Sequence, residues 1–260
     1  MLELRNIVKD FHQGSLIRST FRVLDDVSFD LKKGKIVGMT GESGSGKTTL
    51  ARIALRLMEP TSGSIILDDL DITHMPLRRL RPLRNRFQIV FQHPEGALDP
   101  ELRIHESLRE ALIMSGTPRN AIRERMTEVC SEVNLLSELL DRYPSQVSGG
   151  EVQRAVLARV MSFHPDYLFL DEPTSMLDVS VQAFILDFIR KRVKNEGMGI
   201  VLITHDVDII RCMCSDVLVL SNGTIVDRGP VENVLNERSD GPASKIVRLW
   251  DSQKELISAP

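Results

Sequence analysis

The stretch of sequence that decides the fold reads Lys35-Ile36-Val37-Gly38-Met39-Thr40-Gly41-Glu42-Ser43-Gly44-Ser45-Gly46-Lys47-Thr48-Thr49. Its first part, Lys35–Thr40, is a short apolar run typical of a buried strand. Its second part, Gly41–Thr48, follows the pattern G-x-x-x-x-G-K-[ST], and a helix is predicted over Lys47–Met58. The alternative interpretation is a chance glycine-rich turn. Because the loop follows an apolar strand and precedes a predicted helix, the stretch instead predicts a phosphate-binding loop.

Each residue type in this loop suits a phosphate ligand. Backbone N–H groups can surround a phosphate only where side chains are absent, as at Gly41, Gly44 and Gly46. Lys47 adds a charge for the β- and γ-phosphate oxygens, and Thr48 offers a hydroxyl to Mg²⁺. The predicted ligand is therefore a magnesium-bound nucleoside triphosphate, contacted by Gly41, Glu42, Ser43, Gly44, Ser45, Gly46, Lys47, Thr48 and Thr49.

Two acids follow a second apolar strand, Tyr167–Asp171. Because ligands of open α/β sheets bind at the carboxyl ends of strands, we expect Asp171 to face the metal ion. Glu172, one residue further on, can hold and polarise the attacking water, since phosphoryl transfer mainly needs positioning and charge compensation. A solvated acid pair in a turn before Pro173 is the alternative interpretation, but the phosphate loop favours the catalytic one.

Strands and helices alternate through much of the chain. Strands are predicted at Phe87–Gln92, Tyr167–Asp171 and Gly199–Thr204, and helices at Gly150–Phe163 and Val179–Asn195. This alternation predicts an α/β fold with a mainly parallel sheet that is covered on both faces.

Three other regions have different patterns. Leu2–Val8 and Val23–Leu31 alternate in the manner of strands, and residues 93–144 have a helical pattern broken by prolines. Asn222-Gly223 separates two apolar runs and predicts a tight hairpin turn. From Val231 onward we expect two short helices around Gly241-Pro242.

The bulk composition excludes several classes of protein. The 260 residues include 33 basic and 36 acidic side chains, a net charge of -3, which argues against a nucleic-acid binder. No apolar run approaches the roughly 18 residues that span a bilayer, and the first residues lack a signal-peptide pattern. We therefore expect a cytoplasmic protein that acts on a membrane only through another protein.

The cysteines, Cys130, Cys212 and Cys214, show no disulfide-framework spacing and indicate a reducing compartment. Cys212 and Cys214 lie on a predicted helix without a nearby Cys or His pair that could complete a metal site. We expect them to be buried thiols that act as small apolar groups.

The segment Val147-Ser148-Gly149-Gly150-Glu151 resembles the signature of the ABC ATPase family. Ser148 supplies a hydroxyl, and Gly149 and Gly150 leave the N–H groups of a helix N-terminus bare, which makes a second anion site. The resemblance implies ATP as the nucleotide, held head-to-tail between the signature of one subunit and the phosphate loop of another. Glu151 stands where glutamine is commoner in the family, and an acid is also favourable in a first helical turn.

Further segments match the family in the same order. The resemblance implies that Gln92 senses Mg²⁺ and water, that Asp178, in the loop Ser175–Asp178, reaches the partner subunit, and that His205 contacts the γ-phosphate. Phe11 stands where an aromatic ring stacks on adenine, although Phe21 competes for this role, and the alternative for either ring is a place in the core. The alternative for Gln92 and His205 is a polar cap at a strand end. The implied catalytic group is Lys47, Gln92, Glu172 and His205, and the implied Mg²⁺ group is Thr48, Gln92 and Asp171.

The resemblance also implies a domain plan: an ABC ATPase domain over residues 1–230, a helical extension over 231–260, an N-terminal antiparallel β subdomain and a helical subdomain at about 93–160. Detail in Arg86–Pro100, Arg142–Gly150 and Leu177–Ala183 resembles the oligopeptide, dipeptide and nickel import ATPases. In that branch two different ATPase subunits usually pair at the cytoplasmic face of the membrane, beneath two different permease subunits served by an extracytoplasmic binding protein. For this chain the second ATPase subunit is expected to be a paralogue or a second copy. There His93–His105 is implied to form the groove for a permease helix.

The cargo and the assembly stay open at this point. Asn236–Lys245 lacks the His-Pro-Tyr element of many peptide importers, which favours nickel or a chelated metal over peptides. The alternative function is a soluble ATPase of a carbon–phosphorus lyase-type enzyme complex, which resembles the same branch. A chromosome-maintenance ATPase is disfavoured because no coiled coil or zinc module separates loop and signature, and an inactive subunit is disfavoured by Glu172 and His205.

Overall fold

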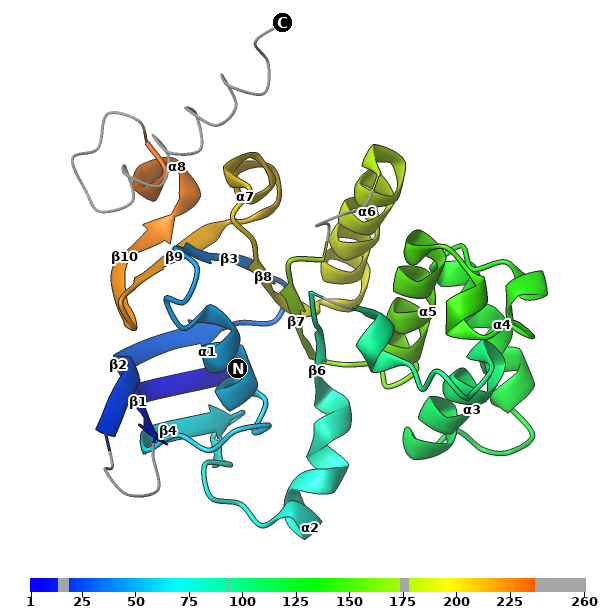
Figure 1. The fold of residues 1–260 in the computed structure, drawn as a ribbon, viewed down its shortest axis with the longest axis horizontal. Coiled ribbons are helices and arrows are strands. Elements are labelled where there is room, and N and C mark those ends of the chain that lie inside the picture. The colour runs from blue at the N-terminus through cyan, green and yellow to red at the C-terminus, as the bar shows by residue number, and fades with distance from the viewer. Residues whose placement is uncertain (14–18, 93, 174–177, 237–260) are drawn as a thin grey trace, which may run out of the picture.

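The computed structural model describes residues 1–13, 19–92, 94–173 and 178–236, and two β-sheets form its centre (Figure 1). The larger sheet contains β3 (Ile36–Gly41), β6 (Phe87–Val90), β7 (Tyr167–Asp171), β8 (Gly199–Ile203), β9 (Asp216–Ser221) and β10 (Thr224–Pro230). The smaller sheet contains β1 (Leu2–Gln13), β2 (Ser19–Leu31), β4 (Ser62–Leu67) and β5 (Leu70–Asp71).

The larger sheet has the order β10-β9-β3-β8-β7-β6 and is parallel except for β10, which pairs antiparallel with β9. Every residue of β7 is buried, and its side chains alternate between two cores. Leu168 and Leu170 belong to one core, and Tyr167 and Phe169 to the other. A strand that buries both faces is apolar throughout, which is why its sequence pattern was continuous. The predicted α/β fold with a mainly parallel sheet is confirmed.

Helices and the smaller sheet cover the two faces of the larger sheet. The α-helices are α1 (Lys47–Ala54), α2 (Leu77–Leu80), α3 (Ile104–Met114), α4 (Ile122–Glu132), α5 (Gly149–Met161), α6 (Val179–Glu196), α7 (Val207–Met213) and α8 (Val231–Val234). Short 3₁₀ helices lie at Arg81–Arg86, Pro94–Ala97, Ser137–Leu139 and Pro144–Gln146. α1 packs with the smaller sheet in one core, whereas α3, α4, α5 and α6 share the other. In Figure 1, α3, α4 and α5 form a group beside the sheets; its limits as a subdomain stay a prediction.

The smaller sheet is antiparallel in the order β2-β1-β4-β5, as expected for the N-terminal strands. Its apolar residues alternate with exposed ones, and Leu2, Leu4 and Ile7 on β1 are buried. One face of this sheet therefore packs on the same core as α1, which brings β2 close to the glycine-rich loop.

The first helix ends earlier than its sequence predicted, at Ala54 rather than Met58. Arg56 has a left-handed conformation with φ 52°, and the N–H of Leu57 donates to the carbonyl of Arg52 at 2.9 Å, which closes the helix C-terminus. The guanidinium of Arg56 is buried and donates to the carbonyl of Ile72 at 2.8 Å. A tertiary contact thus stops a helix at a residue that favours helix on its own.

The predicted hairpin is confirmed at Asn222 and Gly223, which join β9 and β10 with φ values of 47° and 77°. Two successive positive φ angles are the geometry that Asn-Gly favours in tight hairpins. β10 then leads into α8. The second expected helix, around Gly241-Pro242, lies outside the described residues.

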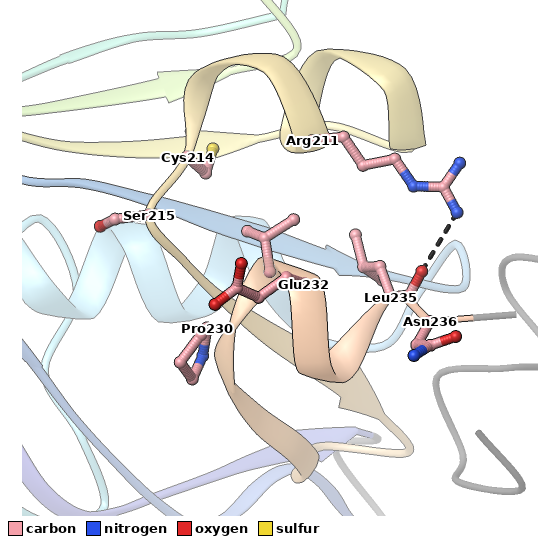
Figure 2. A pocket seen from close by; sticks show the side chains of 8 residues that line it. Arg211, Cys214, Ser215, Pro230, Glu232, Leu235 and Asn236 are labelled. Carbon is pink, nitrogen blue, oxygen red and sulfur yellow. Dashed lines mark hydrogen bonds between the residues drawn. The ribbon is translucent and has the colours of Figure 1, made fainter. Parts of the chain in front are cut away.

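A cavity of about 720 Å³ lies between α7 and α8 (Figure 2). Arg211 at its edge donates from Nη2 to the carbonyl of Leu235 at 3.1 Å, which ties the end of α8 to α7. Cys214 lines this cavity, is partly buried, and burial raises the pKa of its thiol to about 12. Cys130 is buried as well. Cys212 is exposed, so the expectation of a buried thiol was wrong there, because it lies on the outer side of the short α7.

Within the described ranges, no helix has the length and apolar character that crossing a bilayer requires.

The amino ends of the parallel strands are joined by an ion-pair network. Asp166, just before β7, accepts from Lys33 Nζ at 2.5 Å and from Arg86 Nε at 2.6 Å. Burial acts to raise the pKa of Asp166, but the hydrogen bonds from Lys33 and Arg86 outweigh it, so the pKa lies below its usual value of 3.8. The folded state therefore favours the charged carboxylate.

We expect Asp166→Asn to lower the free energy of unfolding by about 1–2 kcal/mol at neutral pH, since two charge-assisted hydrogen bonds are weakened. Because the folded pKa is depressed, this contribution is complete above pH 3.8 and is lost as pH falls through the lower folded value. Urea unfolding at neutral and acidic pH measures it. The control Asp187→Asn, in an exposed pair with Lys191, should change stability by less than about 0.5 kcal/mol. If Asp166→Asn lowered the free energy of unfolding equally at neutral and acidic pH, this would contradict the assigned contribution of the Asp166 carboxylate.

Candidate functional site

The glycine-rich loop lies between β3 and α1 and packs against two neighbouring strands. Gly41 has φ 148°, and a Cβ there would lie 2.0 Å from the carbonyl oxygen of Leu220 on β9. Gly46 has φ 105°, and its Cβ would lie 2.7 Å from Leu24 Cδ2 on β2. Glycine is therefore required at both positions by backbone conformation and by close packing. The loop curves so that the N-terminus of α1 faces the carboxyl edge of the sheet.

The turn of the β9–β10 hairpin supports this loop from one side. The N–H of Gly223 donates to the carbonyl of Ser45 at 3.2 Å, and the carbonyl of Gly223 accepts from the N–H of Asp25 at 2.9 Å. The sequence predicted the hairpin but not this contact, because nothing local in residues 222–223 indicates where the turn will dock.

Lys47 lies across the loop at the start of α1. Its Nζ donates to the carbonyls of Gly41 and Glu42, both at 2.8 Å. Burial lowers the pKa of the Lys47 ammonium, while the negative charges of Glu172 and Asp171 act in the opposite direction. The ammonium is thus held within the site and partly desolvated, where its charge would interact strongly with a phosphate ligand.

Thr48 and Asp171 are joined directly. The hydroxyl of Thr48 donates to Asp171 Oδ2 at 2.8 Å, although the two residues are 123 positions apart in the chain. Asp171 is only 5% exposed, and burial raises its pKa against the opposing hydrogen bond of Thr48. A buried carboxylate beside a hydroxyl offers the hard oxygen donors that Mg²⁺ prefers, so these residues fit this ion.

Two of the predicted residues contact the carboxylate of Glu172. Nδ1 of His205 lies 3.0 Å from Glu172 Oε1, and Nε2 of Gln92 donates to Oε2 at 3.3 Å. Glu172 itself has φ 48°, a conformation that costs a non-glycine residue about 1–3 kcal/mol. Its N–H donates to the carbonyl of Ile203 at 2.9 Å. The ends of β6 and β8 therefore place two side chains around the carboxylate that follows β7.

These groups surround a cavity of about 360 Å³ at the carboxyl edge of the larger sheet. Among its lining residues only Val23, on β2, was not predicted from the sequence, because its place over the loop depends on how the smaller sheet packs. The lining residues are Val23, Gly41, Ser43, Gly44, Gly46, Lys47, Thr48, Thr49, Gln92, Asp171, Glu172 and His205.

Phe11 and Phe21 lie apart from this lining. They are opposite each other on β1 and β2, with side chains 38% and 65% exposed. Nζ of Lys9 lies 5.1 Å from the centre of the Phe11 ring. Either ring presents an accessible face, so the stacking role of Phe11 stays a prediction.

The signature segment forms the N-terminus of α5, also outside the cavity lining. Ser148 caps the helix, and one oxygen of Glu151 accepts from its N–H at 2.7 Å and from its hydroxyl at 2.9 Å. Ser148 and Gly149 are exposed. A Cβ at Gly150 would lie 3.1 Å from Val181 Cγ2, but a Cβ at Gly149 would meet nothing within 4 Å. Nothing within the described residues of this chain therefore requires glycine at position 149.

Asp178 has a local role in the structure, because its Oδ1 accepts from the N–H groups of Ser180 and Val181 and so caps α6. Its predicted contact with a partner subunit stays a prediction. The rest of that predicted loop, residues 175–177, lies outside the described residues.

Comparisons with known proteins agree with this geometry. A family model described as "ABC transporter" matches residues 24–175. The chain is similar to a "Putative peptide import ATP-binding protein" of Brucella ovis, with 38% identity over 235 residues that cover 90% of this chain and 73% of the relative. It is also similar to "Methionine import ATP-binding protein MetN" of Photobacterium profundum, with 34% identity over 248 residues, 95% of this chain and 70% of the relative.

A solved structure has the same fold. It is described as the dimeric structure of a post-hydrolysis state of the ATP-binding cassette MJ0796 bound to ADP and Pi. The TM-score is 0.81 with 27% identity, over 89% of this chain and 99% of the other.

Replacing Lys47 by alanine should weaken ATP binding about 10- to 100-fold, because one charge-assisted hydrogen bond to phosphate is lost. Folding should be kept, since the hydrogen bonds of Lys47 Nζ within the described part of the chain all go to the loop segment. Titration with a fluorescent ATP analogue measures the affinity, and Lys191→Ala, on the exposed side of α6, is the matched control. Unchanged binding by the Lys47 variant would remove this residue from the phosphate site.

Proposed function

Because this chain belongs to the ABC transporter family, we propose that it is the ATP-hydrolysing subunit of an importer and works as one half of a head-to-tail nucleotide sandwich. The relatives named above as import ATP-binding proteins support the direction of transport. They also favour a transporter over the soluble carbon–phosphorus lyase-type complex. In this assembly the subunit lies at the cytoplasmic face of the membrane, bound to permease subunits.

The observation that carries the sandwich is the bare tip of α5. Ser148 and Gly149 are exposed and do not line the cavity of their own chain. Gly149 lacks a side chain although no neighbour among the residues that the structure describes would obstruct one. A helix N-terminus with exposed N–H groups attracts anions, so the tip suits a triphosphate held by a second subunit. The dimeric arrangement of the similar ATP-binding cassette supports this geometry.

The proposed hydrolysis uses positioning more than covalent chemistry. The glycine-rich loop and Lys47 hold the β- and γ-phosphates, and Thr48, Asp171 and Gln92 are the oxygen ligands for Mg²⁺. When bound, this ion supplies charge neutralisation at the phosphate oxygens. Glu172 accepts a proton from the attacking water, and His205, 3.0 Å from its carboxylate, contacts the γ-phosphate.

In this proposal, a groove on the ATPase subunit couples the nucleotide site to the membrane subunits. A cavity of about 810 Å³ lies between the end of α1, the β6 strand and the α3–α5 group. Its walls include Leu57, Leu77 and Met114, which are 49%, 70% and 63% exposed. Exposed apolar side chains around one groove mark an interaction site, and we assign it to a helix of a permease subunit. It lies beside, not within, the stretch His93–His105 that the sequence indicated.

For the cargo, peptides are favoured over nickel. The relative with 38% identity is named as a peptide import protein. The preference for nickel depended on the missing His-Pro-Tyr element in Asn236–Lys245, and neither relative named above is described as a nickel importer. The partner ATPase can be a second copy or a paralogue, and co-purification of the assembly identifies it together with the permeases and the binding protein.

We expect Glu172→Gln to keep ATP affinity while turnover falls about 100- to 10,000-fold, because the amide no longer accepts the proton of water. A closed dimer should accumulate with ATP, which size-exclusion chromatography detects. Glu138→Gln, outside the site, serves as the control. Hydrolysis at the parental rate would remove Glu172 from the role of general base.

The Gly149→Ala variant should change thermal stability and ATP turnover in different directions. Alanine is favoured over glycine in a helix by about 0.5–1 kcal/mol, so thermal stability should be equal or higher. ATP turnover of the assembly should fall about tenfold or more, since the added methyl lies where a facing triphosphate must approach. Gly150→Ala should stabilise the protein less than Gly149→Ala, because its Cβ would lie 3.1 Å from Val181 Cγ2, which must shift to accept it. Full turnover in a stable Gly149→Ala protein would contradict the sandwich.

A further inference from the structure

Gln153 is a buried polar residue that the proposed mechanism does not use. It lies on α5, just beyond the first turn that begins at Ser148, and is 2% exposed. Its Nε2 donates to the carbonyl of Pro173 at 3.2 Å. A buried amide is costly unless it is hydrogen-bonded, so this bond determines where the side chain lies.

The acceptor lies directly after the candidate general base. Pro173 follows Glu172, whose backbone has the left-handed conformation with φ 48°. The N–H of Glu172 donates to Ile203, and the carbonyl of Pro173 accepts from Gln153, so the turn is held on both sides. Strained conformations persist only where the surroundings hold them. The two bonds therefore set the direction in which the Glu172 carboxylate points.

The opposite end of this connection is the anion-binding tip. Ser148 and Glu151 form a capping box, and α5 continues from there as one helix to Met161. Arg154, next to Gln153, donates to the carbonyl of Val133 at 3.0 Å and lies 4.0 Å from the centre of the Phe184 ring. α5 is thus tied to its neighbours as a rigid element, and a shift of its tip moves the Gln153 amide as well.

We propose that Gln153 is a positioning residue that connects the α5 tip, which faces the partner's nucleotide, to Glu172 in the chain's own nucleotide site. The inference rests on the proposed sandwich. Docking of the partner's triphosphate against Ser148 and Gly149 fixes the position of α5, and the bond to Pro173 transmits this position to the turn that carries the base. Each site then becomes competent for hydrolysis only when the other is closed.

The first test replaces Gln153 by methionine, which has a similar length and helix preference but no donor. In the assembly purified with its partner ATPase, we expect kcat for ATP to fall about 10- to 100-fold, as for a misplaced catalytic group. The affinity for ATP should change less than twofold, because Gln153 hydrogen-bonds to Pro173 and is not among the described residues that line the cavity. Cooperativity in ATP concentration should also decrease.

The matched control is Ser162→Ala at the C-terminal cap of the same helix. Ser162 is fully buried, and among the described residues its hydroxyl donates to the carbonyl of Ala158, one turn earlier. The Ser162→Ala variant therefore loses a buried hydrogen bond without changing a contact of the Glu172 turn. Its kcat should stay near the parental value. Equal losses of kcat in both variants would reduce Gln153 to a structural role and overturn the proposal.

A second variant keeps the proposal testable if methionine disturbs folding. Gln153→Glu places a carboxyl group at the same atom position, and only its protonated form can donate to the carbonyl of Pro173. Relative to the parent, its kcat should recover as pH falls, whereas that of Gln153→Met should not. A pH profile parallel to that of the parent would overturn the proposal. Absence of ATP turnover in the parent assembly would instead reject the proposed function itself.

Discussion

The parallel pairing of β6, β7, β8 and β3 is the constraint on which the rest of the molecule depends. Parallel strands end at a common edge, so residues that follow different strands come together there. Gln92, Asp171 and His205 meet at this edge although long stretches of chain separate them. The opposite edge is joined by the ion pairs of Asp166. The candidate site and the ion pairs of Asp166 therefore lie at opposite ends of the same strands.

The two cores of the molecule serve different parts of this site. The core shared by α1 and the smaller sheet holds the glycine-rich loop, because Gly46 packs on Leu24 and Val23 borders the cavity. The core shared by α5 and α6 holds the signature tip, because Gly150 packs on Val181. The larger sheet separates the cores, so the loop and the tip of one chain are supported independently. This division suits the proposed sandwich, in which the two anion sites of one chain bind two different nucleotides.

Electrostatics at the site follow from burial. Asp171 is almost fully buried, and its raised pKa reflects the cost of holding a charge there. Lys47 is desolvated as well, and its pKa is lowered despite the acids beside it. Asp171 and Lys47 carry opposite charges, and both are desolvated. They therefore favour a ligand that pairs with both charges, and a magnesium-bound triphosphate offers a cation for the carboxylate and anionic oxygens for the ammonium. At the α5 tip, the Glu151 carboxylate accepts both the N–H and the hydroxyl of Ser148, which fixes the side chain that faces outward.

The sequence by itself determined the elements that depend on neighbouring residues. The phosphate loop, the buried strand before Asp171 and the Asn222-Gly223 hairpin follow local patterns of glycine, apolar runs and turn residues, and the structure contains each of them. Only the tertiary structure decided where Arg56 ends α1, how Val23 reaches the loop, and that Gln153 bonds to Pro173. These features are contacts between segments far apart in the chain. Their free energy depends on packing that no local pattern encodes, because the same residue types are equally compatible with other neighbours.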